Sequence, residues 1–213
     1  MASRSAYDGQ PSMPTSSFAF HIVAVAGFAG CVPWLVLEAE ALGGRRGQVD
    51  LGVAVAAGGL ALLSAHALAS LWLARPLTAL RTRAEVGTYV QVLVVVGVSA
   101  LLGLHLLTSA EPRPAVGAFC LGLSVWLCGL GFQWVPSLFL GREGFVDHLG
   151  RRTRFDTLEW FRLRKQPGEL PRTWLQAGRG DTLRLEVRLP DEDAERARGR
   201  MLQAGLVSRA PGR

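Results

Sequence analysis

Charged residues are missing from long stretches of the sequence. Four runs contain no Asp, Glu, Lys or Arg and make up about half of the 213 residues: 9–37, 51–74, 86–110 and 114–141. A water-soluble domain needs charge on the outer faces of its helices, so these runs exclude an ordinary soluble protein. The apolar content of 49% also excludes a disordered chain.

Cysteine is scarce as well. The three cysteines, Cys31, Cys120 and Cys128, all lie in charge-free runs and form no C-x-x-C pair. This pattern predicts no disulfide or zinc site. The sequence also lacks a Gly-rich phosphate loop and a Ser/His/Asp arrangement typical of catalysis. We therefore expect no metal, no cofactor and no enzymatic activity.

Each charge-free run is long enough to cross a membrane once, because about 20 apolar residues in a helix span a hydrocarbon core of about 30 Å. Small residues recur at four-residue spacing within the runs, as at Ser99 and Gly103, which favours close helix packing. A compact four-helix bundle explains this spacing, and a homodimer face is the alternative. We predict a flexible segment at 1–17 and a membrane domain at 18–141, with spans at about 18–37, 51–74, 89–108 and 115–140.

Arginine residues set the expected orientation. The link between the second and third spans contains Arg75, Arg81 and Arg83, and most of the other arginines follow the fourth span. By the positive-inside rule, both segments face the cytoplasm. We therefore expect both termini to be cytoplasmic.

The chain changes character at Arg142, where apolar and charged residues begin to alternate with the period of a half-buried strand. The clearest strand is 182–189, and a helix rich in Asp and Glu at its start follows Pro190. About five short strands and this helix predict a small cytoplasmic α+β domain at 142–206, with a flexible tail at 207–213. The expected fold class is a membrane all-α four-helix bundle plus this domain.

The tail carries a resemblance to a known family. The segment Gly144-Phe-Val-Asp-His-Leu-Gly150-Arg-Arg-Thr-Arg-Phe-Asp-Thr-Leu-Glu-Trp160, the later strands and the acidic-start helix resemble the PH-like domains attached to membrane helices in bacteria. The resemblance implies an antiparallel PH-like sheet with a C-terminal helix in the inner membrane of a bacterium. It also implies a binding or scaffolding role rather than catalysis. A complete PH fold has seven strands, against about five expected here.

Basic residues near the start of the tail are the candidate binding surface. They form two groups, Arg151, Arg152 and Arg154, then Arg162, Arg164 and Lys165. Basic clusters close to a membrane are attracted to anionic lipid headgroups. We expect them to bind membrane lipids or a protein partner, with a merely solvated basic face as the alternative. We expect no nucleic acid, because no stacking platform or groove-reading helix accompanies them.

Polar residues within the spans leave two other functions open. His21 and His66 are weak candidates for haem ligands, which predicts a small b-type cytochrome or quinone-linked subunit. Their expected depths in the membrane differ by about 7 Å. Gln91, Ser99 and His105 on the third span form a polar stripe. That stripe is typical of interhelical hydrogen bonding, or of one wall of a small channel or transporter.

Overall fold

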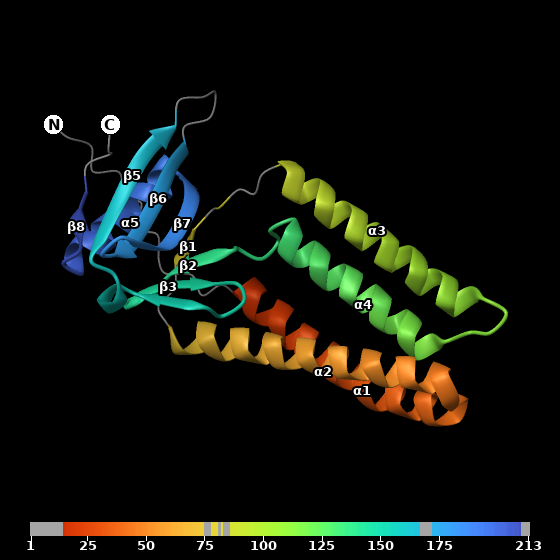
Figure 1. Cartoon of the computed structure of the whole chain (residues 1–213). Coiled ribbons are helices and arrows are strands. Elements are labelled where there is room, and N and C mark those ends of the chain that lie inside the picture. The colour runs from red at the N-terminus through yellow and green to blue at the C-terminus, as the bar shows by residue number, and fades with distance from the viewer. Residues whose placement is uncertain (1–14, 75–77, 81, 83–85, 167–171, 210–213) are drawn as a thin grey trace.

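The computed structural model describes residues 15–74, 78–80, 82, 86–166 and 172–209. Four helices are long and apolar enough to cross a membrane, and a separate antiparallel-sheet region ends in a further helix (Figure 1). The expected combination of a helical membrane part and a small α+β domain is therefore confirmed. The membrane helices are α1 (Thr15–Leu42), α2 (Gly44–Leu73), α3 (Val86–Thr108) and α4 (Pro114–Gly131).

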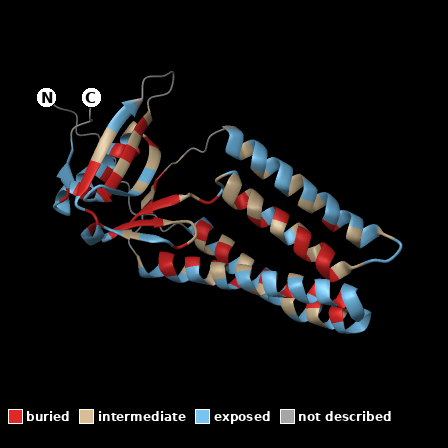
Figure 2. Ribbon diagram, viewed as in Figure 1, coloured by how far each residue is buried: buried red, intermediate tan, exposed pale blue. Residues whose placement is uncertain are grey.

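The membrane helices form two hairpins, α1 with α2 and α3 with α4. The hairpins meet chiefly through α1 and α4, where the Phe28 ring lies 6.0 Å from the Phe119 ring and 6.2 Å from the Trp126 ring. Figure 2 shows that α3 is exposed along most of its length. Most of its exposed side chains are apolar, as on a lipid-facing helix, and they include Val94, Val98 and Leu101.

The first two helices are longer than predicted. The sequence predicted a loop between residues 37 and 51, but α1 continues to Leu42 and α2 begins at Gly44, so only Gly43 joins them. At 28 and 30 residues these helices are longer than the hydrocarbon core is thick, and their charged ends extend beyond it. Helix α1 also includes residues 15–17 of the predicted flexible segment, and residues 1–14 lie outside the described residues.

The fourth helix is shorter than predicted. It ends at Gly131, and the predicted end of the span forms strand β2 (Leu138–Leu140) instead. All three residues of β2 are buried. A strand buried on both faces is a continuous apolar run, which periodicity does not distinguish from the end of a helix.

The α+β domain contains two antiparallel sheets of consecutive strands. Sheet A has the order β1-β2-β3-β4 and sheet B the order β7-β6-β5-β8, in which only β8 is parallel to its neighbour. Sheet A comprises β1 (Thr78–Leu80), β2, β3 (Gly144–Asp147) and β4 (Arg152–Arg154). After the short 3₁₀ helix η1 (Phe155–Thr157), sheet B comprises β5 (Trp160–Gln166), β6 (Arg172–Arg179), β7 (Thr182–Pro190) and β8 (Val207–Ser208). Helix α5 (Asp191–Gln203) lies between β7 and β8 in the chain.

The domain begins earlier and ends later than predicted. Its first strand, β1, lies in the link between α2 and α3, with Thr78 opposite Leu140 and Leu80 opposite Leu138. The membrane hairpin α3–α4 is therefore an insertion between the first two strands of sheet A. At the other end, the predicted flexible tail contains β8. This strand directly follows the buried Leu206 and pairs with β5. Residues 210–213 lie outside the described residues.

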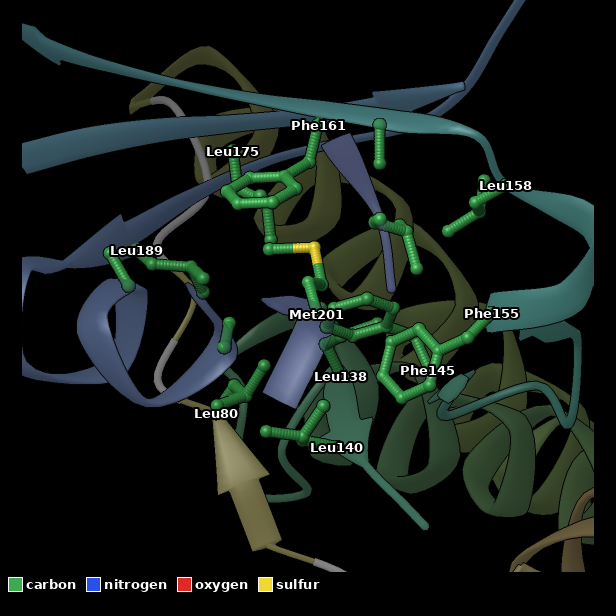
Figure 3. Packing of buried hydrophobic residues seen from close by; sticks show 14 residues of the cluster. Leu80, Leu138, Leu140, Phe145, Phe155, Leu158, Phe161, Leu175, Leu189 and Met201 are labelled. Carbon is green, nitrogen blue, oxygen red and sulfur yellow. The ribbon is translucent and has the colours of Figure 1, made fainter. Parts of the chain in front are cut away.

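The central strands of sheet A, β2 and β3, are buried on both faces. Leu80, Leu138 and Phe145 point into the core shared with sheet B and α5, where Met201 of α5 lies among them (Figure 3). The alternate residues Phe139 and Val146 pack with Leu71 of α2. The layers therefore run from the ends of α1 and α2 through sheet A and the core to sheet B. Sheet A is the contact between the membrane helices and the domain, and the outer face of sheet B points away from those helix ends.

Candidate functional site

The six basic residues predicted as one surface lie on two different sheets. Arg151, Arg152 and Arg154 belong to β4 and the turn before it in sheet A, and Arg162, Arg164 and Lys165 belong to β5 in sheet B. The core of the domain separates the two sheets. The structure therefore brings each group of three together but not the whole set.

The first group lies at the junction with the membrane helices. Val146 packs towards α2 and pairs with Arg152 across the sheet, so Arg152 and Arg154 lie on the side of sheet A that faces the helices. The guanidinium Nη2 of Arg152 donates a hydrogen bond of 2.9 Å to the carbonyl of Ser70, in the last turn of α2. A cation is favourable there because carbonyl groups give the C-terminal end of a helix a partial negative charge.

The turn that carries Arg151 is held tightly against α2. Asp147 Oδ1 accepts hydrogen bonds from the backbone N–H groups of Leu149, at 2.9 Å, and Arg151, at 2.8 Å. Gly150 has a φ of +84°, and a Cβ at this position would lie 2.9 Å from the Cα of Ala67. The backbone conformation and the space both require glycine. Arg151 is exposed on this fixed turn, and Arg154 pairs with Asp156 at 2.9 Å.

Two members of the second group, Arg162 and Arg164, form part of a larger basic surface on the outer face of sheet B. Along β5, Phe161 and Leu163 point to the core, so Arg162 and Arg164 point outwards. The neighbouring strands place Gln176 and Glu186 beside Arg162, and Trp174 and Arg188 beside Arg164. Sequence reasoning missed the other arginines of this face because they belong to different strands. By the same alternation, the outer-face arginines are Arg162, Arg164, Arg172 and Arg188, and Arg184 lies beside them where the register between β6 and β7 shifts at Ala177 and Gly178.

Lys165 differs from its two neighbours in orientation. It pairs across the sheet with Thr173, whose side chain is buried on the core side. Lys165 is exposed because it lies near the end of β5, beyond most of the core. It therefore belongs to the end of the sheet rather than to the outer face.

Arginine side chains cover two tryptophan rings of sheet B. The Arg188 guanidinium carbon lies 4.1 Å from the centre of the Trp174 ring, and that of Arg209 lies 4.7 Å from the Trp160 ring. Trp160 Nε1 donates a hydrogen bond of 2.7 Å to the carbonyl of Gly180. Stacking against a ring fixes the plane of a guanidinium and leaves its N–H groups available at the edge.

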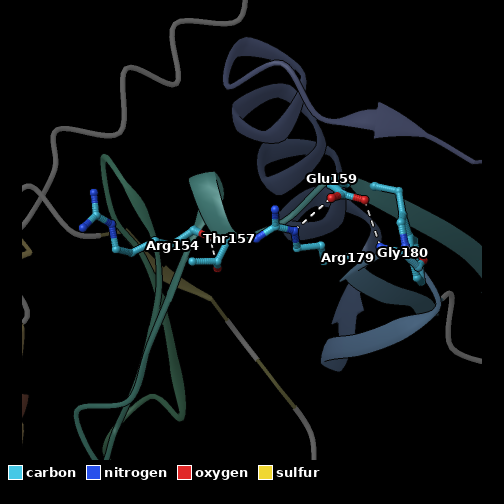
Figure 4. A network of polar contacts seen from close by, with 6 residues as sticks. Arg154, Thr157, Glu159, Arg179 and Gly180 are labelled. Atoms are coloured by element: carbon cyan, nitrogen blue, oxygen red, sulfur yellow. Dashed lines mark hydrogen bonds and ion pairs between the residues drawn. The ribbon is translucent and has the colours of Figure 1, made fainter.

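A carboxylate fixes the turn between β6 and β7. Glu159 accepts hydrogen bonds of 2.9 Å from Arg179 Nε and from the backbone N–H of Gly180 (Figure 4). These bonds, the Gly180 N–H first and the Arg179 side chain second, lower the pKa of Glu159 below its usual value. Both carboxylate oxygens of Glu159 therefore accept hydrogen bonds from residues of the turn. Glu186, bonded to Gln176 at 2.9 Å, is the acidic residue on the outer face within the described strands.

The two candidate haem ligands have different surroundings. His21 is buried in the first turns of α1, close to His148 of the domain, whereas His66 is exposed on α2. His148 Nδ1 lies 3.2 Å from the carbonyl of Ser137. In the described part of the chain, no group of three or more His, Cys, Asp or Glu residues could hold a metal ion. The structure therefore places these histidines at the junction with the α+β domain.

The polar stripe on the third span does not form a common lining. Ser99 Oγ donates a hydrogen bond of 3.0 Å to the carbonyl of Cys120 on α4. Gln91 and His105 are exposed on α3, near its two ends. This arrangement matches the interhelical hydrogen bonding expected for Ser99, and the other two side chains lie on the outer surface of the helix pair.

Sequence reasoning missed an ionic cluster at the end of the helices far from the domain. Asp50 of α2 is fully buried and pairs with Arg113, just before α4. Glu38 Oε2 of α1 accepts a hydrogen bond of 2.8 Å from the backbone N–H of Ala115, in the first turn of α4. The cluster joins the two hairpins. Its signal in the sequence is weak, because these residues lie at the edges of different charge-free runs.

Comparisons with protein-family models, with curated proteins and with solved structures find no match to this chain.

Proposed function

We propose that the chain is a non-catalytic integral protein of a bacterial inner membrane that holds a PH-like module at the cytoplasmic face. The module would bind anionic lipid headgroups or a protein partner. The number and order of the strands support the PH-like interpretation. Strands β1 to β7 run antiparallel in sets of four and three, and a helix follows the last of them. Of the three strands that the sequence did not predict, β1 and β2 precede the five expected strands and make seven with them, the number in a complete PH fold, and β8 follows the helix.

Charge supports the cytoplasmic orientation of the module. The chain after Gly141 contains 16 basic and 11 acidic residues, whereas the links at the far end of the helices are close to balanced. Positive charge is retained on the cytoplasmic side of a bacterial membrane. Exposed Trp72 and Trp134 also lie near the domain end of α2 and α4, as expected for aromatic side chains at the headgroup level.

The observation that carries the proposal is the packing of sheet A against the membrane helices. The domain is interlocked with the bundle through β1, and the turn of Arg151 is pressed against α2. This packing gives the module one fixed orientation. Arg154 and the turn that carries Arg151 then lie beside the helix ends, on the side proposed to face the membrane, where each basic residue near an anionic surface contributes about 1 kcal/mol.

Lipid retention tests the proposal. The full-length protein would be extracted from its membrane in polymer-bounded nanodiscs, and the lipids in the discs would be compared with those of the bulk membrane. We expect enrichment of anionic lipids around the wild type and less enrichment around the double variant Arg151→Ala with Arg154→Ala. Arg152 is left unchanged because its hydrogen bond to Ser70 supports the junction.

The control variant removes the same charge elsewhere. Arg198 and Arg200 lie exposed on α5, so Arg198→Ala with Arg200→Ala should leave the enrichment intact. Equal lipid composition around the wild type and in the bulk membrane would contradict headgroup binding. So would an equal loss in the two double variants.

A further inference from the structure

We infer that the outer face of sheet B is a docking surface for an extended acidic segment of a protein partner. This inference rests on the proposed function, because it needs the domain to stand in the cytoplasm where such a partner can reach it. The proposed partner is an acidic protein segment, and the surface it would bind is the one that faces away from the helix ends. The face is formed by β5, β6 and β7.

The arrangement of charge on this face is regular. Arg162 and Arg164 lie two residues apart on β5, which corresponds to about 6.7 Å, and neighbouring strands lie about 4.8 Å apart. Across the sheet, Arg184 and Arg188 lie on β7. An extended peptide with acidic residues at alternate positions repeats at the same distance of about 6.7 Å. Its carboxylates would therefore match the arginines along a strand, and each guanidinium can bind a carboxylate with two N–H groups.

Among the described residues, acidic side chains are scarce on this face. Arg164 and Arg184 are exposed and form no ion pair within the described part of the chain. The acidic residue among them, Glu186, is bonded to Gln176. Basic side chains held close together on one surface repel each other, so a partner of opposite charge relieves that repulsion.

The surface is also rigid. Below it, Phe161, Leu175 and Ala177 are fully buried in the core. Above them, Arg188 is stacked on Trp174. A partner that binds a preformed surface loses less free energy to side-chain ordering than one that must organise mobile side chains.

The position of the face argues against the protein's own membrane as its ligand. Sheet A lies between the helix ends and the core, and sheet B lies beyond that core. Packed sheets are about 10 Å apart, and an exposed charge is screened over about 8 Å at physiological salt. The headgroups that contact the sheet A side are therefore too distant to engage the outer face of sheet B.

The aromatic residues argue against single-stranded nucleic acid. Binding of bases depends on open aromatic rings for stacking. Trp174 and Trp160 each have an arginine over the ring. The recognition expected here is charge-assisted hydrogen bonding between guanidinium and carboxylate groups.

Peptide binding to the full-length protein tests the inference. The protein would be reconstituted in nanodiscs of phosphatidylcholine, and fluorescence anisotropy would follow a labelled peptide of alternating Glu and Ser. A peptide of alternating Gln and Ser is the uncharged control. We expect saturable binding of the acidic peptide and none of the uncharged one. The double variant Arg164→Glu with Arg184→Glu should weaken the binding about tenfold or more, since one decade corresponds to about 1.4 kcal/mol.

Matched variants separate recognition from general attraction. Arg198→Glu with Arg200→Glu changes the net charge equally but on α5, and it should weaken binding much less. The conservative variant Arg188→Lys keeps the charge but lacks the planar guanidinium group with its paired N–H donors, so it should also weaken binding. An equal loss in the two Glu double variants would overturn the inference, as would the absence of binding. Tighter binding of a single-stranded oligonucleotide with the same arginine dependence would overturn it in favour of nucleic acid.

The lipid measurement keeps this inference distinct from the proposed function. Anionic lipid enrichment that depends on Arg151 and Arg154, together with no peptide binding, would remove the docking surface but keep the membrane-facing module. If neither anionic lipid enrichment nor peptide binding were observed, the proposed function would be contradicted as well.

Discussion

Asp50 and Arg113 form a buried ion pair that joins the two helical hairpins. Asp50 is fully buried, and the Arg113 side chain is 21% exposed. An ion pair in such surroundings is costly to form, and removal of one partner leaves a buried charge without compensation. The pair therefore fixes the position of α4 relative to α2.

Substitution of Arg113 should show this dependence. We expect Arg113→Ala to lower the stability of the detergent-solubilised protein by about 3 kcal/mol, measured as a decrease in the thermal midpoint of unfolding. Arg46→Ala is the control, because Arg46 and Glu111 form an exposed pair, with side chains 65% and 73% exposed. Such a pair contributes about 1 kcal/mol or less. Similar midpoints for the two variants would contradict a structural role for the buried pair.

The sequence identified the basic residues of the domain but not which of them lie on sheet A and which on sheet B. Arg162 and Arg164 could be recognised as an alternating pair on one strand. Arg172, Arg184 and Arg188 join them only after β6 pairs with β5 and β7 pairs with β6, and residue spacing in the chain does not give that register. The pairing of Asp50 with Arg113 could not be predicted from residue spacing either, because it depends on contact between separate helices.

At the scale of elements, glycine sets the closest approach of α3 and α4. A Cβ at Gly103 would lie 2.9 Å from the carbonyl oxygen of Gly117, and a Cβ at Gly117 would lie 3.0 Å from that of Gly103. The four-residue spacing correctly marked Gly103 for helix contact, whereas Gly122, which follows Ala118 at the same spacing, has no atom within 4 Å of such a Cβ. The four-residue period locates small residues but does not say which of them face another helix.

Substitution of glycine by alanine, which adds one methyl group, should distinguish a glycine at the helix contact from one that faces open space. We expect Gly103→Ala to destabilise the protein by about 1 to 3 kcal/mol, because a backbone carbonyl blocks the new methyl group and the helices must move apart. Gly97→Ala on the same helix meets nothing within 4 Å and should leave stability equal or slightly higher. Thermal unfolding of the two variants in the same detergent makes the comparison. Equal effects would contradict the close crossing of α3 and α4.

The elements that sequence reasoning identified are those with a clear period of their own. The charge-free helices and the alternating strands β5 and β7 are of this kind. Strands β1 and β2 have three residues each, too few to show an alternation, and all three residues of β2 are buried. Strand β8 has two residues and depends on contact with β5.

At the scale of the whole molecule, the membrane helices and the α+β domain form an interlocked structure. The chain forms two helices, contributes β1, forms two more helices, and then completes both sheets. A fragment that begins at residue 142 lacks β1 and β2, and with them Leu80, Leu138 and Leu140 of the core. Binding experiments therefore need the full chain. The fixed orientation of sheets A and B, on which the proposed headgroup contact and the proposed docking surface both depend, follows from this interlocking.

Disulfide cross-linking between β1 and β2 in native membranes tests this central claim most directly. With the three native cysteines replaced by serine, Thr78→Cys and Leu140→Cys place two thiols at opposed positions of an antiparallel pair. Opposed Cα atoms in such a pair lie about 4.5 to 5.5 Å apart, within the range of a disulfide. Thr78→Cys with Leu138→Cys is the control, because it is displaced by two residues and exceeds that range. We predict rapid cross-linking of the first pair under mild oxidation and little of the second. Equal rates, or no cross-link in the first pair, would contradict the closure of the domain by the link between α2 and α3.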